Sequence, residues 1–147
     1  MIAVLQRTSN ASVSVKDKII GQIKDGVVVL LGVKRGDSYL ESEYLAHKVS
    51  KLRIFNDKQN KMNLSLVDIY GSVLVISQFT LCADTRKGRR PSFVNAESPE
   101  LSKRLYNKFI SCLADKGLKV QSGEFGSNMD VKLVNNGPVT FVLDSED

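Results

Sequence analysis

The chain has 147 residues, 42% of them hydrophobic and 25% charged, with a net charge of +5. This composition is typical of a soluble globular protein and excludes the disordered and fibrous classes, while the positive charge favours an anionic partner such as nucleic acid. The chain has two cysteines and a single histidine, His47, which exclude a disulfide framework and a zinc cluster. Because His47 lies in an amphipathic segment, we expect it to have a structural place on a helix, so an enzyme built on this chain works without imidazole.

The length fits one domain over residues 1–147, large enough to bury a core without cross-links. The N-terminal segment MIAVLQRTSNASVSV has no leader pattern, and no apolar run approaches the ~18 residues that span a bilayer. We therefore expect cytoplasmic residence and no membrane contact. No glycine-rich phosphate loop, Walker motif or suitably spaced carboxylate pair is present, so kinase, nucleotidase and glycosidase activities have no support.

The first third of the chain alternates between apolar strands and turn signals. We predict strands over residues 11–15, 18–23 and 26–33, joined as an antiparallel meander through Lys16-Asp17 and Asp25-Gly26. Ser38 and Glu41 then have capping-box spacing, which predicts a helix over residues 38–52. The side chains expected near its apolar face are Leu40, Tyr44, Val49 and Leu52.

The second half begins with an apolar run, SVLVISQFTL at residues 72–81, which predicts a strand buried on both faces. Ser98 as N-cap and Pro99 at the first helical position then predict a helix that closes at Gly117, and strands follow it. We therefore predict an α/β fold. It is a strand-rich single domain of mixed or antiparallel sheets in β/β/α layers, covered by two helices and not doubly wound.

Three polar residues, Ser77, Gln78 and Thr80, interrupt the end of the apolar run. Polar groups there need hydrogen-bond partners, because an unpaired one costs about 1 to 3 kcal/mol. Either the surrounding fold or a ligand supplies them. Thr80 is a weak nucleophile without an adjacent base, so it does not by itself establish covalent catalysis.

A basic loop follows, in which four cations surround a glycine: Arg86, Lys87, Arg89 and Arg90. Such a loop either binds phosphates or is simply solvated, and charge alone does not separate the two interpretations. Phe93 is the aromatic residue closest by for stacking on a base.

A Gly137-Pro138 pair interrupts the closing strand pattern LVNNGPVTFVLD. Proline donates no hydrogen bond to a sheet and is confined to edges, strand starts and bulges. The pair is either a turn or edge between two strands, or a rigid backbone feature directed at a ligand.

Together, SQFT at residues 77–80 and NNGPVT at residues 135–140 resemble the D-aminoacyl-tRNA deacylases, also described as D-tyrosyl-tRNA(Tyr) deacylases. The likeness runs through AVLQR, GVVVLLGV, SQFTLCAD, RPSF and NNGPVTFVLDS. It implies a homodimer that hydrolyses the ester between a D-amino acid and the 3′-terminal ribose of tRNA. It implies no metal or organic cofactor.

The resemblance also implies residue roles. Gly137-Pro138 is cis and enters the pocket of the other subunit, so each active site lies at the subunit interface. The implied catalytic residues are Gln78, Phe79 and Thr80. The implied substrate-binding residues are Ser77, Gly137, Pro138, Phe125 and Met129. Arg7 would support the Gly-Pro segment across the interface, and Arg86, Lys87, Arg89 and Arg90 would contact tRNA phosphates. Ser127 and Asn128 receive no role.

Two mechanisms stay open at this point. Thr80 attacks the ester, or the backbone N–H of Phe79 or Thr80 stabilises the oxyanion while the ribose 2′-hydroxyl assists water; the second is favoured because no base lies beside Thr80. The resemblance also implies that the main chain of the Gly137-Pro138 segment forms a wall that rejects L-amino acids by collision with their side chains. Because glycine has no side chain, this wall cannot exclude it. The alternatives are a non-catalytic nucleic-acid-binding module, a related enzyme group with a trans Gly-Pro that admits L-alanine, and a structural protein.

Overall fold

A curled, mixed six-stranded sheet forms the centre of the computed structural model, which describes residues 1–146. Its strands are β1 (Ile2–Val15), β2 (Lys18–Ile23), β3 (Gly26–Gly32), β6 (Ser72–Ser77), β7 (Lys119–Ser122) and β8 (Asp130–Asp144). The order is β2-β1-β3-β6-β7, with β8 also paired to β1. β6 is parallel to β3 and β7, and the other pairings of this sheet are antiparallel. The predicted mixed sheet is confirmed.

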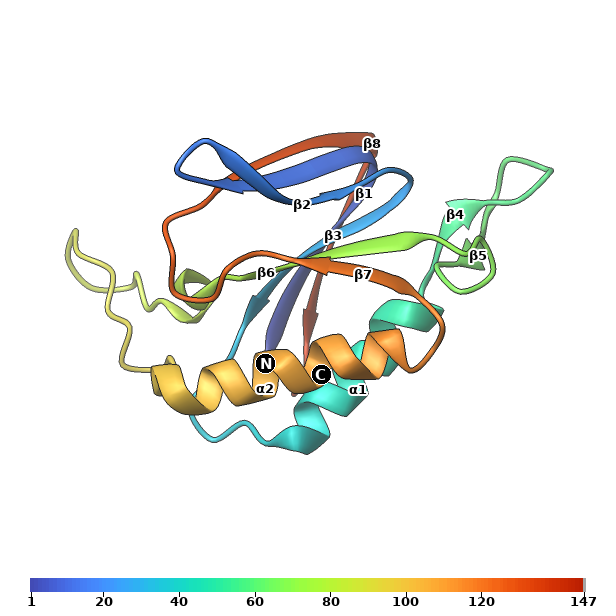
Figure 1. Cartoon of the computed structure of the whole chain (residues 1–147). Helices are drawn as coiled ribbons and strands as arrows, with labels where there is room; N and C mark the ends of the chain where they lie inside the picture. The colour runs from blue at the N-terminus through green and yellow to red at the C-terminus, as the bar shows by residue number, and fades with distance from the viewer. Residues whose placement is uncertain (147) are drawn as a thin grey trace.

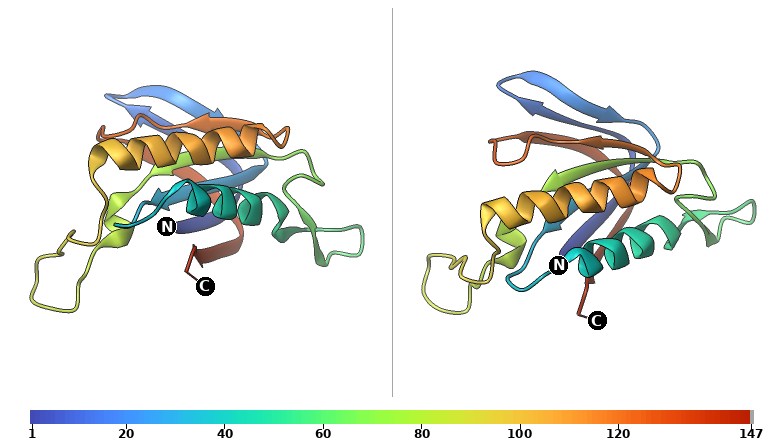
Figure 2. Two further views of the ribbon diagram at one scale, coloured as in Figure 1. Left: turned by 90° about the horizontal axis from the view of Figure 1, so that it is seen from below. Right: turned by 60° about the horizontal axis from the view of Figure 1, so that its bottom comes forward.

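Two helices, α1 (Tyr39–Lys51) and α2 (Pro99–Ala114), lie side by side on one face of this sheet (Figures 1 and 2). The larger hydrophobic core lies between helices and sheet and includes Leu45 and Phe109. A smaller core fills the curl, where Val13, Val28 and Leu74 meet. The predicted β/β/α layering is therefore present. Within residues 1–146, no helix is long and apolar enough to cross a membrane.

Strands β2 and β3 lie end to end along one edge of β1. Residues 2–8 of β1 pair with β3 and residues 11–15 pair with β2, while β8 runs along the opposite edge. The predicted hairpin through Lys16-Asp17 is confirmed, since Val15 pairs with Lys18. The rest of the predicted meander is wrong: β3 pairs with β1 and not with β2, because the 14-residue β1 is long enough to hold both partners in succession. Gly26 permits the start of β3, since its φ is +157° and a Cβ there would lie 1.9 Å from the carbonyl oxygen of Ser72.

Helix α1 has the predicted capping box of Ser38 and Glu41 but buries a different face. Leu40 and Tyr44 are exposed, so the predicted apolar face is wrong at these positions. The helix instead packs through small and medium side chains: Ser42, Leu45, Ala46, Val49 and Ser50. The Ser42 hydroxyl donates 3.1 Å to the carbonyl oxygen of Leu105 in α2, a close helix contact that a larger side chain would prevent.

The buried strand predicted over residues 72–81 ends earlier than expected. β6 stops at Ser77, and a 3₁₀ turn, η1 (Phe79–Cys82), follows it. Residues 73–76 are buried against both cores, as predicted. α2 begins at Pro99 as predicted, but the Ser98 side chain makes no capping hydrogen bond; the carboxylate of Glu97 instead accepts from the Ser98 N–H.

A two-stranded hairpin, β4 (Arg53–Asn56) and β5 (Met62–Ser65), was not predicted from the sequence. Each strand has only four residues, two of them polar, which is too short a run to show a clear strand pattern. Figure 1 shows that the hairpin projects from the body of the protein, at the opposite end from η1. Its tip, residues 57–61, carries Lys58 and Lys61.

Candidate active site

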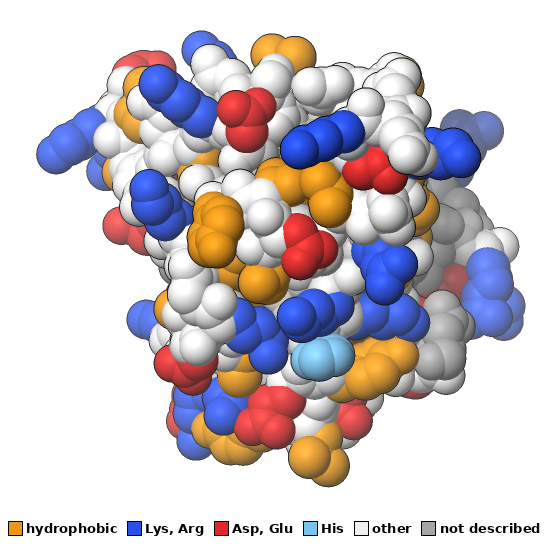
Figure 3. All heavy atoms as spheres, turned by 90° about the vertical axis from the view of Figure 1, so that its right-hand side faces the viewer, with side chains coloured by type: hydrophobic (Ala, Val, Ile, Leu, Met, Phe, Trp, Pro, Cys, Tyr) orange, Lys and Arg blue, Asp and Glu red, His pale blue; other side chains and the backbone are white. Residues whose placement is uncertain are grey.

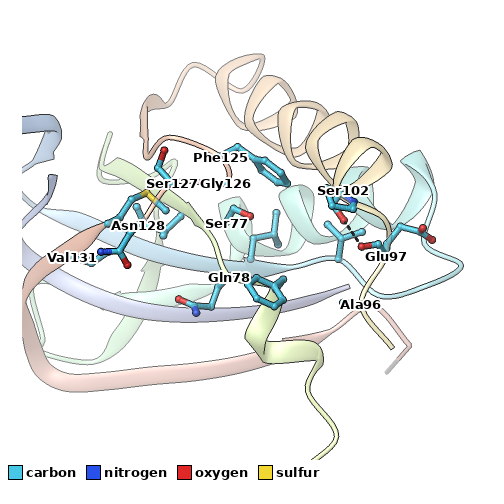
Figure 4. A pocket seen from close by; sticks show the side chains of 16 residues that line it. Ser77, Gln78, Ala96, Glu97, Ser102, Phe125, Gly126, Ser127, Asn128 and Val131 are labelled. Atoms are coloured by element: carbon cyan, nitrogen blue, oxygen red, sulfur yellow. Dashed lines mark hydrogen bonds between the residues drawn. The ribbon is translucent and has the colours of Figure 1, made fainter. Parts of the chain in front are cut away.

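A pocket of about 470 Å³ opens where β6 passes into η1 (Figure 4). Its apolar lining includes Leu31, Val33, Ile76, Phe79, Phe125, Met129 and Val131. Its polar lining is Ser77, Gln78, Glu97, Ser102, Ser127 and Asn128. Five of the predicted site residues, Ser77, Gln78, Phe79, Phe125 and Met129, therefore meet around one cavity.

One wall of the pocket is formed by η1, which packs closely on β3. A Cβ at Gly32 would lie 3.0 Å from Leu81 Cβ and 3.1 Å from the carbonyl oxygen of Gln78. The Gln78 N–H donates to the carbonyl oxygen of Leu31 at 2.8 Å, which fixes the point where the strand turns. The next two N–H groups, of Phe79 and Thr80, begin the 3₁₀ turn, and such groups have no partner within their own helix.

Thr80 lies beside the pocket but does not line it. Its hydroxyl accepts a hydrogen bond from the side-chain amide of Gln78 at 2.5 Å. An amide N–H cannot take a proton from the hydroxyl, so this contact does not activate Thr80 as a nucleophile. His47 lies exposed on α1, on a different element.

The opposite wall contains Phe125 and Met129, from the segment between β7 and β8. The Phe125 ring contacts the ring of Tyr106 with centroids 5.7 Å apart, and a Cβ at Gly123 would lie 2.6 Å from Met129 Sδ. The Tyr106 hydroxyl donates to the carbonyl oxygen of Val75 at 2.8 Å. Burial raises the pKa of Tyr106 to about 12, so this group is a neutral structural donor behind the wall.

Several lining residues were not predicted from the sequence. Glu97 lies just before α2, and Ser102 lies in its first turn (Figure 4). Hydrogen bonds from the N–H groups of Ser98 (2.7 Å) and Gly36 (3.2 Å) lower the pKa of Glu97. Ser127 and Asn128, to which no role was given, also line the cavity; their place next to Met129 was the available signal.

Gly137 and Pro138 do not line this pocket within one chain. They belong to a bulge of β8, because residues 136–139 stand opposite the single residue Arg7 of β1. Their peptide bond is cis and both residues are exposed. The pair is not a turn, since β8 continues pairing with β1 on both sides of the bulge. It does lie at an edge, because among residues 1–146 β8 pairs with no other strand.

Side chains fix the base of this bulge. The Asn135 amide donates to the Thr140 hydroxyl at 2.8 Å, and its oxygen accepts from the Val139 N–H at 2.9 Å. Arg7 donates through Nε to the carbonyl oxygen of Asn136 at 2.9 Å. Arg7 was expected to support the Gly-Pro segment of a partner subunit; the contact found supports the segment of its own chain.

The basic loop is exposed and closed by paired backbone hydrogen bonds between Asp84 and Ser92, of 2.8 and 2.9 Å. Arg86 makes a two-pronged contact with the Asp84 carboxylate, at 2.9 and 2.7 Å, and this guanidinium holds the pKa of Asp84 far below its usual range. Within residues 1–146, Lys87, Arg89 and Arg90 form no ion pair. Between loop and pocket, the rings of Phe79 and Phe93 lie 4.9 Å apart.

Comparison with known proteins extends over nearly the whole chain. The model of the D-Tyr-tRNA(Tyr) deacylase family matches residues 4–144. A D-aminoacyl-tRNA deacylase of Thermosipho africanus is 51% identical, over 99% of this chain and 98% of the relative. One from Thermotoga petrophila is 54% identical, over 99% and 97%. The structure of a c-Myc DNA unwinding element binding protein matches with a TM-score of 0.92 and 37% identity, over 98% of each chain.

Proposed function

Because the chain belongs to the D-Tyr-tRNA(Tyr) deacylase family, we propose that it hydrolyses the ester between a D-amino acid, or glycine, and the 3′-terminal ribose of tRNA. Relatives more than half identical to it are D-aminoacyl-tRNA deacylases. The observation that carries the proposal is the single pocket formed by SQF of the first motif together with Phe125 and Met129. The reaction takes place on cytoplasmic tRNA.

The working unit in this proposal is a homodimer in which Gly137-Pro138 of one subunit closes the pocket of the other. Two observations support it. The bulge is exposed and fixed, yet it contributes nothing to the pocket of its own chain. In addition, among residues 1–146 β8 pairs only with β1, so its outer edge is open, and it exposes Val134, Phe141 and Val142. An open edge strand with apolar side chains is a surface suited to association.

In this proposal the bulge selects the substrate by the chirality of its amino acid. Main-chain carbonyl oxygens of the Gly137-Pro138 segment accept hydrogen bonds from the α-ammonium group, and the backbone leaves space on only one side of the α-carbon. The L-side chain collides with this wall, whatever its identity. Glycine has no side chain to collide, so glycyl-tRNA is hydrolysed as well.

The chemistry we propose uses water. Water adds to the ester carbonyl carbon, the bond from that carbon to the ribose oxygen breaks, and the ribose oxygen takes a proton as it leaves. The N–H group of Phe79 or Thr80 stabilises the oxyanion, and the 2′-hydroxyl of the ribose assists the water. Thr80 does not attack the ester, since its hydroxyl contacts an amide and not a base; it accepts a hydrogen bond from Gln78, which lines the pocket. Lys87, Arg89 and Arg90 bind phosphates of the tRNA. Arg86 joins them when its ion pair with Asp84 opens.

The experiment is hydrolysis of D-tyrosyl-tRNA, L-tyrosyl-tRNA and glycyl-tRNA by the purified protein. We expect release from the D and glycine esters and none above background from the L ester. The variant Thr80→Ala keeps substantial activity if water is the nucleophile. Complete loss of turnover with intact substrate binding would instead identify Thr80 as the nucleophile, and an untouched glycyl ester would refute the backbone-wall account.

A non-catalytic nucleic-acid-binding module is the second candidate. The likeness to a c-Myc DNA unwinding element binding protein, 37% identical, raises it, but the more similar relatives are D-aminoacyl-tRNA deacylases and favour the enzyme. The same basic loop would serve in this role. Binding of tRNA without release from any of the three esters would establish it.

A further inference from the structure

We propose that the β4–β5 hairpin binds phosphates of the tRNA whose 3′ end occupies the pocket of the partner subunit. This inference rests on the proposed function, and specifically on the entry of Gly137-Pro138 into the partner's pocket. It assigns a role to a segment that lies outside the pocket of its own chain.

The hairpin and the bulge form one connected unit. The guanidinium of Arg7 donates to the bulge at the carbonyl oxygen of Asn136 (2.9 Å) and, through Nη1, to the carbonyl oxygen of Ile54 in β4 (2.7 Å). It also reaches Asn56 Oδ1 at 3.4 Å. The Asn56 amide in turn donates to Asn60 Oδ1 at 2.8 Å, in the tip of the hairpin. When the bulge docks on the partner subunit, the base of the hairpin is therefore held beside the docking site, with the tip projecting from it.

The hairpin tip has the charge and the fixed shape that a phosphate site needs. Lys58 and Lys61 are exposed and form no ion pair within residues 1–146. The one carboxylate of the tip, Asp57, is occupied by the chain itself: it accepts from the N–H groups of Gln59 (2.8 Å) and Lys61 (3.0 Å). These bonds lower the pKa of Asp57 and hold the tip without using either lysine side chain.

The position of the hairpin points to the partner's pocket and not to its own. Within one chain the hairpin projects at the opposite end of the protein from η1 and the basic loop (Figure 1). Figure 3 views this side of the molecule and shows Lys and Arg side chains spread over it. A tRNA acceptor end would then contact the basic loop of the subunit that holds the ester and the hairpin of the other subunit.

The first test uses the double variant Lys58→Ala/Lys61→Ala in the full-length dimer. We expect KM for D-tyrosyl-tRNA to rise about 3- to 10-fold with kcat unchanged. The slope of the logarithm of the tRNA binding constant against the logarithm of the salt concentration should become shallower by about 1.4, because each lost phosphate contact accounts for about 0.7. Hydrolysis of D-tyrosyl-adenosine, which has no phosphate, stays at the wild-type rate. The control is Lys24→Ala/Lys119→Ala, which removes the same charge from exposed lysines of the β2–β3 turn and of β7.

The second test separates the two subunits in mixed dimers purified with two tags. One subunit carries Ser77→Phe, which fills its pocket, and the other carries the hairpin double variant. The surviving pocket then faces a wild-type hairpin, and we expect a wild-type KM. When both changes are placed on the same subunit, the surviving pocket faces the altered hairpin and KM rises.

Two results would overturn the inference. One is an unchanged KM in the hairpin variant, and the other is the reverse pattern in the mixed dimers, which would place the hairpin beside its own pocket. Both require a wild-type enzyme that hydrolyses D-tyrosyl-tRNA. A wild-type protein that hydrolyses none of the esters refutes the proposed function itself.

Discussion

The pocket and the bulge of β8 are opposite in character. The pocket lies among apolar side chains from several elements, with Phe125 held against Tyr106 behind it. The bulge stands in solvent, yet it is fixed by Asn135 and Arg7 through four side-chain hydrogen bonds to residues 136–140 and to β4. A surface segment is usually less constrained than the elements it connects. The bulge is held by hydrogen bonds as firmly as a pocket wall, but it lines no part of the pocket of its own chain.

The difference suggests that each region is half of a site. The pocket supplies walls and N–H donors at the start of η1, and the bulge supplies main-chain oxygen atoms at an exposed point. In the proposed function the backbone of the bulge distinguishes D from L substrates, which requires that the bulge be positioned accurately. Arg7, Asn135 and the strand pairing on both sides of the bulge provide that accuracy. Changing each half separately tests this division.

The largest effect is expected from Gly137→Ala. Gly137 has φ +138°, and a Cβ there would lie 2.6 Å from Val139 Cγ2 and 2.9 Å from the Val139 nitrogen. We expect kcat/KM for D-tyrosyl-tRNA to fall at least about 100-fold, or about 2.7 kcal/mol. The Tm, measured by calorimetry, should fall by about 2 to 12 °C, since such strain costs about 1 to 3 kcal/mol.

Gly117→Ala is the matched control for this variant. Gly117 follows α2, has φ +79°, and has no atom within 4 Å of its Cβ position. It pays the same kind of backbone penalty far from the bulge, so it should lower Tm without changing kcat/KM. Equal kcat/KM in the Gly137→Ala and Gly117→Ala variants would show that the bulge takes no part in catalysis and would refute the division of the site between pocket and bulge.

The elements that could be predicted from the sequence are those with local signals. The capping box at Ser38, the proline that opens α2 and the strand 18–23 are all found where they were expected. The first motif also led to the pocket, because polar side chains at the end of a buried strand need hydrogen-bond partners from the fold or from a ligand. The sequence could not show that β2 and β3 share one edge of β1, since strand pairing depends on contacts distant along the chain.

The burial of α1 and the place of Arg7 were less accessible for related reasons. Leu40 and Tyr44 are large and apolar, but the face that packs is the one with Ser42 and Ala46, because helix α2 approaches closely there. Arg7 stands in a strand with no local pattern to set it apart. Its role depends on the four residues of β8 that stand opposite it, three more than regular pairing needs, and only the register reveals them.

A smaller effect is expected from Arg7→Lys. One ammonium group cannot reproduce the separate bonds of Nε to Asn136 and Nη1 to Ile54, 2.9 and 2.7 Å long. We expect kcat/KM to fall about tenfold, the loss of one charge-assisted hydrogen bond, with discrimination against L-tyrosyl-tRNA reduced. Steady-state hydrolysis of both esters measures it. Arg104→Lys, at an exposed position of α2, makes the same exchange of side chains away from the bulge and should leave both rates unchanged; an equal drop there would show that the effect does not depend on the two contacts of Arg7.

The smallest effect is expected behind the pocket, in Tyr106→Phe. The variant removes the buried bond to Val75 but keeps the ring contact with Phe125, so it should lose about 1 kcal/mol of stability with kcat unchanged. In the wild type, burial raises the pKa of Tyr106 to about 12, whereas the unfolded chain titrates near 10. Between these values the unfolded state releases a proton that the folded state keeps, so the hydroxyl's contribution to stability is complete below pH ~10 and declines as pH rises toward 12. Urea unfolding across this range should therefore show a steeper loss in the wild type than in the variant. A tenfold fall in kcat at neutral pH would instead place the hydroxyl in the reaction and make this wall an active part of the site.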